Sequence, residues 1–280
     1  MNERTRRISL LAPVLLVIAL GAAWQVPDAG WLRLSASDAD DVDRMRATLD
    51  GLADGPLVLV GFDADLGTYA EIRPTVRALL ADLLGRDGRL AFVSVTPEGR
   101  ALASLELARL ARGRANAARL LDLKFISGAE AGLVDLTRSI RVPDDAGDAV
   151  FAGRVASEGI GAFDAIVVVG GNDVGPRSWV EQVAPRIGEV PFIAVTPTVL
   201  LPEVQPYVGN RLAAILGTPR DGAAYREGLD SGALERLEDS TAPRSLPVLI
   251  GMLIAIAVLA HGLGRRALDQ VRTAKAREVT

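Results

Sequence analysis

The stretch "PLVLVGFDADLGTYAE", residues 56–71, decides the fold class of this chain. Residues 56–62 form an apolar run without a charge, which is typical of a strand that is buried on both faces of a parallel sheet. Two aspartates, Asp63 and Asp65, follow the run at once, and Gly67 and Thr68 come next. The open question is whether this carboxylate pair performs chemistry or only finishes the strand.

The same alternation of apolar runs and helical patterns continues along the chain. We expect four further strands, and helices between them with apolar positions at helical spacing. The expected strands are 89–95, 121–126, 165–169 and 191–195, and the expected helices are 72–84, 100–111, 130–140, 151–158, 179–187, 207–217 and 223–229. This order predicts an α/β fold, a three-layer Rossmann-like parallel sheet of about five strands.

The two ends of the chain carry long uncharged segments, residues 8–24 and 246–264. Each is long enough to cross a hydrocarbon layer of about 30 Å. Three arginines precede the first segment and five basic residues follow the second, so the positive-inside rule places both termini in the cytoplasm and the middle outside it. The first segment also fits a cleaved signal peptide, with small residues at 21–23. We therefore expect a plasma-membrane protein with an extracytoplasmic domain.

These segments divide the chain into seven parts. They are a basic cytoplasmic N-terminus (1–7), a transmembrane helix or signal anchor (8–24), an acidic stalk with a short helix capped near Ser37 or Asp38 (25–55), an extracytoplasmic α/β domain (56–230), a linker (231–245), a transmembrane helix (246–264) and a basic cytoplasmic tail (265–280). Small residues such as Gly251 and Ala255 would let the second span pack closely against other membrane proteins or a second copy.

Charge and composition exclude several classes of function. All but eight of the 31 basic residues and all but three of the 35 acidic residues lie between the predicted spans, so this net acidic middle segment should repel nucleic acid. The chain has no cysteine, and its one histidine, His261, lies in the second predicted span. Histidine-based triads, histidine-rich zinc sites and cysteine nucleophiles are therefore excluded from the domain. No glycine-rich phosphate loop is present.

Ligands of open parallel sheets bind beyond the carboxyl ends of the strands, so the residues that follow each expected strand are the site candidates. The ligand-binding candidates are Asp63, Asp65, Thr68, Ser94, Thr96, Ser127, Gly128, Gly170, Gly171, Asn172, Asp173 and Thr196, and the metal candidates among them are Asp63, Asp65 and Asp173. A structural alternative exists for Thr96-Pro97 and Thr196-Pro197. In each pair the threonine can cap a helix whose first turn holds the proline.

The motif "FDADLGT" resembles the first motif of the haloacid dehalogenase superfamily. That resemblance implies a phosphohydrolase in which Asp63 attacks and Asp65 is the general acid and base, with Mg²⁺ as cofactor. It further implies that Ser94 or Thr96 holds the phosphate, that Lys124 supplies a cation and that Asp173 helps to hold the metal.

A second resemblance covers more of the chain. The succession "FDAD…TYAEIRP", "SVTPEG", "SGAEAGL" and "GTPRDGAAYREGL", with a span at each end, is similar to a group of uncharacterised prokaryotic membrane-anchored α/β proteins, which supports the architecture only. Three functions stay open. The first is a binding or interaction module in a membrane-associated assembly, the second is the Mg²⁺-dependent phosphohydrolase, and the third is a solute-sensing domain.

Overall fold

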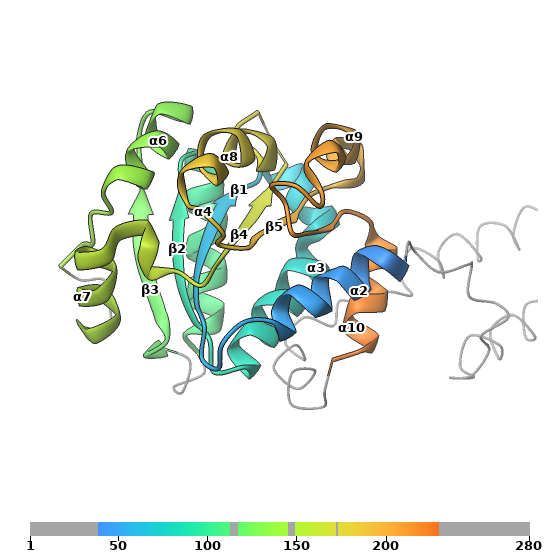
Figure 1. Ribbon diagram of the computed structural model, residues 1–280, viewed down its shortest axis with the longest axis horizontal. Coiled ribbons are helices and arrows are strands. Elements are labelled where there is room, and N and C mark those ends of the chain that lie inside the picture. The colour runs from blue at the N-terminus through green and yellow to red at the C-terminus, as the bar shows by residue number, and fades with distance from the viewer. Residues whose placement is uncertain (1–38, 113–116, 145–148, 172, 230–280) are drawn as a thin grey trace, which may run out of the picture. The chain divides into compact units, whose positions relative to one another are not determined.

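A computed structural model of the chain describes residues 39–112, 117–144, 149–171 and 173–229. It contains six parallel strands in the spatial order β3-β2-β1-β4-β5-β6 (Figure 1). The strands are β1 (Leu57–Asp63), β2 (Arg89–Ser94), β3 (Leu120–Phe125), β4 (Ala165–Gly170), β5 (Phe192–Val195) and β6 (Ala214–Leu216). The predicted parallel α/β sheet is confirmed, with one strand more than the expected five. The strand order reverses between β1 and β4, which makes this pair the topological switch point.

Helices cover both faces of the sheet and give the Rossmann-like arrangement of three layers (Figure 1). One face packs against α2 (Ala39–Asp50), α3 (Leu66–Gly85), α4 (Pro97–Leu110) and α10 (Pro219–Glu227). The other face packs against α6 (Glu130–Arg138), α7 (Ala149–Glu158) and α8 (Pro176–Gln182), with the short α9 (Leu201–Val204) beside α8. Side chains of β1 alternate between the two layers: Val58 and Val60 enter the first core, and Leu57 and Leu59 the second.

The helix predicted over residues 207–217 is wrong. A 3₁₀ turn covers Gln205–Tyr207, and the chain then forms β6, which pairs with β5 at the edge of the sheet. All three residues of β6 are buried. A run of three apolar residues is too short to show whether its period is that of a helix or a strand, so only the pairing with β5 decides it.

The helix expected near Ser37 or Asp38 forms as α2, which begins at Ala39, but it is part of the folded domain. Val42, Met45 and Leu49 are buried in the same core as α3 and α10. Helix α2 contacts β6, the edge strand of the sheet, and α10, next to which it lies in Figure 1. The folded unit therefore extends N-terminal to Pro56, into the region assigned to an acidic stalk.

No helix among residues 39–112, 117–144, 149–171 and 173–229 is long and apolar enough to cross a membrane. The two predicted spans, 8–24 and 246–264, lie outside the described residues, as do the basic termini and the linker at 231–245. The membrane topology therefore stays a prediction from the sequence.

Candidate functional site

Asp63 ends β1 as a fully buried carboxylate with its hydrogen-bond sites occupied. Its Oδ1 accepts hydrogen bonds from Ser94 Oγ (2.8 Å), Val95 N (2.8 Å), Thr96 N (3.0 Å) and Thr96 Oγ1 (3.0 Å). Its Oδ2 accepts one from Trp179 Nε1 (2.8 Å). The carboxylate therefore joins the end of β1 to the turn after β2 and to α8.

Trp179 reaches Asp63 because Gly61 leaves room for it. A Cβ at Gly61 would overlap the indole ring of Trp179, so the ring lies directly on the backbone of β1. Trp179 itself has no exposed surface. Burial raises the pKa of Asp63 from its usual 3.8, while the hydrogen bonds from Trp179, Ser94, Val95 and Thr96 act in the opposite direction.

Asp65 has a different role, two residues later. It is the N-cap of α3: its Oδ1 accepts from Thr68 N (2.9 Å) and its Oδ2 from Thr68 Oγ1 (2.7 Å). These two hydrogen bonds with Thr68 lower the pKa of Asp65. The carboxylate supplies the negative charge that the first turn of a helix favours, so it disfavours an anion at the same turn. Thr68, a predicted ligand residue, is used in this cap.

Backbone packing at the switch point also uses the predicted glycines. A Cβ at Gly171 would overlap the side chain of Thr68, and a Cβ at Gly170 would overlap Pro176. The loop after β4 thus lies directly on the first turn of α3 and on the start of α8. Gly170 and Gly171, two predicted ligand residues, are thus used in close packing of the chain.

The two Thr-Pro pairs behave differently. Thr96 caps α4 through Thr96 Oγ1, which accepts from Gly99 N at 3.3 Å, as expected. The cap expected at Thr196 does not form, because the short 3₁₀ turn after β5 starts at Thr198 without a side-chain cap. Thr196 is fully buried, and its hydroxyl has no hydrogen-bond partner among the described residues.

The loop after β3 places its residues on the surface. Ser127 and Gly128 are both exposed, Gly128 has φ +107°, and Ala129 has φ +49° and ψ −119°. Lys124 Nζ lies 3.2 Å from Asp122 Oδ2, and Asp122 also accepts two hydrogen bonds from Arg100. Asn172 lies outside the described residues. The cation that the phosphohydrolase hypothesis assigns to Lys124 is therefore paired at β3.

The three metal candidates do not come together. Among the residues that the structure describes, no three His, Cys, Asp or Glu side chains are grouped so that they could hold a metal ion. The oxygens of Asp63 accept hydrogen bonds from β2, its following turn and α8, and those of Asp65 accept hydrogen bonds from Thr68. Asp173 is exposed on the loop that follows β4.

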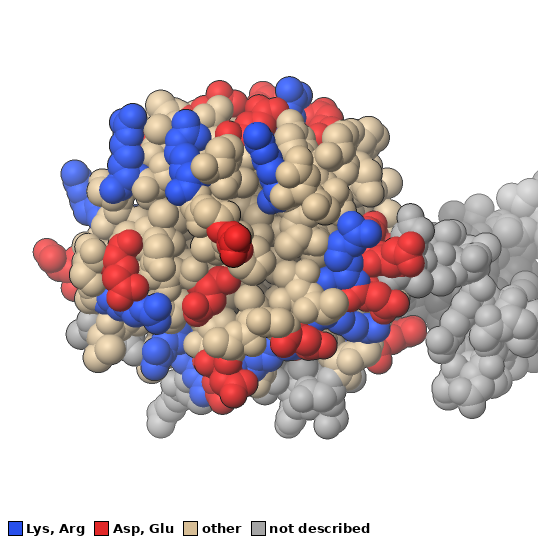
Figure 2. All heavy atoms as spheres, in the orientation of Figure 1, with Lys and Arg blue, Asp and Glu red and all other residues tan. Residues whose placement is uncertain are grey.

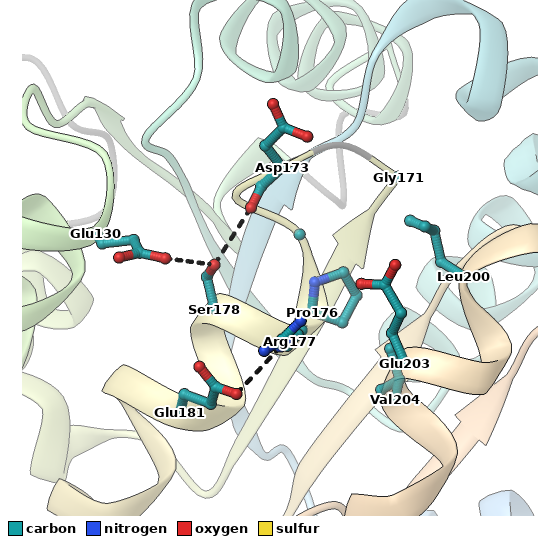
Figure 3. Close-up of a pocket in the computed structure, with 11 residues that line it drawn as sticks. Glu130, Gly171, Asp173, Pro176, Arg177, Ser178, Glu181, Leu200, Glu203 and Val204 are labelled. Atoms are coloured by element: carbon teal, nitrogen blue, oxygen red, sulfur yellow. Dashed lines mark hydrogen bonds and ion pairs between the residues drawn. The ribbon is translucent and has the colours of Figure 1, made fainter.

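A cleft of about 470 Å³ opens at the carboxyl edge of the sheet, between the start of α6, the start of α8 and α9 (Figure 3). We call it the acidic cleft. Of the predicted site residues, Gly171 and Asp173 line it. The others in its lining are Glu130, Gly175, Pro176, Arg177, Ser178, Glu181, Leu200, Glu203 and Val204. Most of these belong to helices that follow the strands, so inspection of the strand ends alone did not find them.

Hydrogen bonds fix part of the cleft wall and leave two carboxylates available. Ser178 Oγ lies 3.0 Å from Glu130 Oε1 and 3.3 Å from the Asp173 carbonyl. Glu181 accepts from Arg177 Nε (3.1 Å) and Tyr207 OH (2.6 Å), and the bond from Tyr207, followed by that from Arg177, lowers the pKa of Glu181. Within the described part of the chain, no hydrogen bond or ion pair engages the carboxylates of Asp173 and Glu203, which stand on two sides of the cleft (Figure 3).

The charge on the lining is strongly one-sided. Among the described residues that line the acidic cleft, four are carboxylates, those of Glu130, Asp173, Glu181 and Glu203, and Arg177 is the only basic one. Over the face of the molecule shown in Figure 2, acidic and basic side chains are interspersed. The cleft lining therefore differs from the mixed charge of the face shown in Figure 2.

No family model matches the chain, and no curated protein matches it either. The class that fold and geometry define is a Rossmann-like α/β domain with a buried, hydrogen-bonded aspartate at its switch point and an acidic cleft beside it.

Proposed function

We propose that the chain is a membrane-anchored extracytoplasmic module that recognises a partner or ligand within a membrane-associated assembly, without a catalytic step at Asp63. The observation that carries this proposal is the state of Asp63. A nucleophilic carboxylate has to reach a substrate, whereas this one has no exposed surface and accepts hydrogen bonds on both oxygens. Its contacts support a structural role.

The acidic cleft is the recognition surface in this proposal. It lies beyond the carboxyl ends of the strands, where open parallel sheets bind their ligands. Two of its carboxylates, Asp173 and Glu203, have no partner among the described residues and favour a ligand or protein surface that carries positive charge. Leu200 and Val204 offer an apolar wall. Anionic substrates such as phosphate esters are disfavoured by the same charges.

The experiment is a binding test on the full chain in detergent micelles. Spermidine and a tetralysine peptide should raise the unfolding temperature, because a ligand that binds only the folded state stabilises it, and inorganic phosphate should not. The rise should be lost in the double variant Asp173→Asn, Glu203→Gln. The matched control is Glu158→Gln, which removes a carboxylate from α7, where Arg154 pairs with it.

The result that overturns the proposal is hydrolysis of a phosphomonoester by the wild-type chain that is lost in Asp63→Asn. That outcome would establish the phosphohydrolase hypothesis. Stabilisation by an uncharged metabolite that does not depend on Asp173 and Glu203 would instead favour the solute-sensing hypothesis.

The membrane topology has its own test, which the absence of cysteine makes simple. A single cysteine at the exposed Ser157 on α7 should react with a membrane-impermeant maleimide in intact cells. A cysteine in place of Thr280 should react only after permeabilisation. The reverse pattern would contradict the extracytoplasmic placement of the domain.

A further inference from the structure

A closed set of hydrogen bonds joins the first and last described helices to α3. Arg86, at the end of α3, donates to Asp50 of α2 (Nη2 to Oδ1, 2.8 Å) and to Asp82 of α3 (Nε to Oδ1, 3.1 Å). The other oxygen of Asp82 accepts from the hydroxyl of Tyr225 on α10. Arg46 of α2 donates to the Ala224 carbonyl at 3.0 Å and completes the set. We call this arrangement the clasp.

Helix α2 is held to the domain by few apolar side chains. Three apolar side chains anchor it in the core, Val42, Met45 and Leu49, and half of its twelve residues are exposed or partly exposed acidic and basic ones. A helix of this length is marginal by itself in water, so its contacts with the domain hold it in place. The elements that open most readily are those with few buried apolar contacts.

The clasp braces α3 across an internal proline. Pro74 removes one backbone hydrogen bond within α3, so the helix is weakest there. Immediately after it, Thr75 packs on Gly222 of α10, where a Cβ would overlap the threonine side chain. About two turns further on, Tyr225 of α10 binds Asp82. Thus α10 holds α3 from Thr75 to Asp82.

The half of α3 before Pro74 contacts one lining residue of the acidic cleft and the turn that leads to another. Thr68 lies against Gly171, which lines the cleft. Glu71 Oε1 accepts from Thr198 N (3.0 Å) and Thr198 Oγ1 (2.9 Å), two residues before Leu200, which also lines it. A change of angle at Pro74 would therefore move these contacts.

We infer that the clasp of α2 and α10 controls the shape of the acidic cleft through a hinge at Pro74 of α3. When α2 is released, the clasp loses the guanidinium of Arg46 and the carboxylate of Asp50. Helix α10 is then held less firmly on α3, and the first half of α3 turns at Pro74. The described residues begin with α2 and end two residues after α10, so both of their ends lie at the clasp. This inference rests on the proposed function of the cleft for its biological meaning.

The test is hydrogen exchange of the full chain in detergent micelles, followed by mass spectrometry, with no ligand added. Arg46→Met should raise exchange in α2 and α10, and by about three- to tenfold in residues 173–181 and 198–204, because one or two hydrogen bonds are lost. Asp50→Asn, at an exposed position, should act in the same direction more weakly and serves if Arg46→Met does not fold. Arg154→Met on α7 is the matched control and should change neither segment.

The hinge is tested by Pro74→Ala, at an exposed position, in the Arg46→Met background. Restoring the missing backbone hydrogen bond should return the cleft segments to wild-type exchange while α2 and α10 stay labile. Exchange that rises only in α2 and α10, or that rises uniformly and includes β3 and α7, would overturn the inference. Either result would overturn only the inference about the clasp. The proposed function of the cleft is tested separately, by ligand binding to chains that carry none of these variants.

Discussion

Two places at the same edge of the sheet carry carboxylates, and they differ in almost every property. At the end of β1, Asp63 is fully buried and accepts hydrogen bonds on both oxygens. In the acidic cleft, next to the end of β4, Asp173 and Glu203 are exposed and unengaged within the described residues. Position at the carboxyl end of a strand therefore does not define a ligand site by itself. A carboxylate at this edge can meet a ligand only if its oxygens are accessible.

The comparison is tested most strongly by removing each carboxylate. Asp63→Ala should lower the free energy of unfolding by about 3 kcal/mol or more, because buried donors of β2, its following turn and α8 lose their acceptor. Asp173→Ala should change it by no more than about 0.5 kcal/mol, since it is a surface substitution. Urea unfolding measures both. Equal effects of the two substitutions would break the distinction between the sites.

The two Thr-Pro pairs provide the next test. Thr96→Val should lower the free energy of unfolding by about 2 kcal/mol, because it removes the cap of α4 and one donor to Asp63. Thr196→Val should raise it by about 1 kcal/mol, because a buried hydroxyl without a partner is replaced by a methyl group. A loss of stability in Thr196→Val would show that this hydroxyl has a partner that the described residues do not supply.

The loop that leads to the acidic cleft allows a paired test of smaller size. Ala129→Gly should raise the free energy of unfolding by about 1 kcal/mol, because glycine adopts φ +49° and ψ −119° without the strain of a Cβ. Ala131→Gly, two residues later and exposed on α6, should lower it by about 0.5–1 kcal/mol. The same substitution thus has opposite signs, and thermal unfolding separates them.

The pH dependence gives the smallest effect. The folded-state pKa of Asp63 is raised, so the folded state binds a proton more readily than the unfolded state, and stability from this group falls as pH rises from 3.8 through the raised pKa. The pKa of Asp65 is lowered, so its contribution is lost as pH falls below 3.8. Relative to wild type, Asp63→Asn should become more stable as pH rises through that window. A difference that grows less favourable with rising pH would contradict the raised pKa.

Local sequence patterns predicted the elements that are long and apolar. The run at residues 57–63 and its counterparts at β2, β4 and β5 are strands as expected. All of their residues except Arg89 are buried, because the side chains of such strands face one of two cores. Strand β6 was missed because its three residues carry no readable period. The cap at Thr96 formed and that at Thr196 did not, although both precede proline, because only the first is followed by an α-helix with a free first turn.

The sequence by itself determined the class of fold and pointed to the carboxyl edge of the sheet, where the acidic cleft lies, because burial on two faces and the turn after each strand are local properties of the chain. Only the tertiary structure decided what the residues there do. Asp63 is buried because Trp179, 116 positions later, lies on Gly61 and donates to it. The acidic cleft arises because α6, α8 and α9, which follow three different strands, meet beside β4. The spacing of residues in the sequence predicts neither of these contacts, because both depend on how distant segments pack on one sheet.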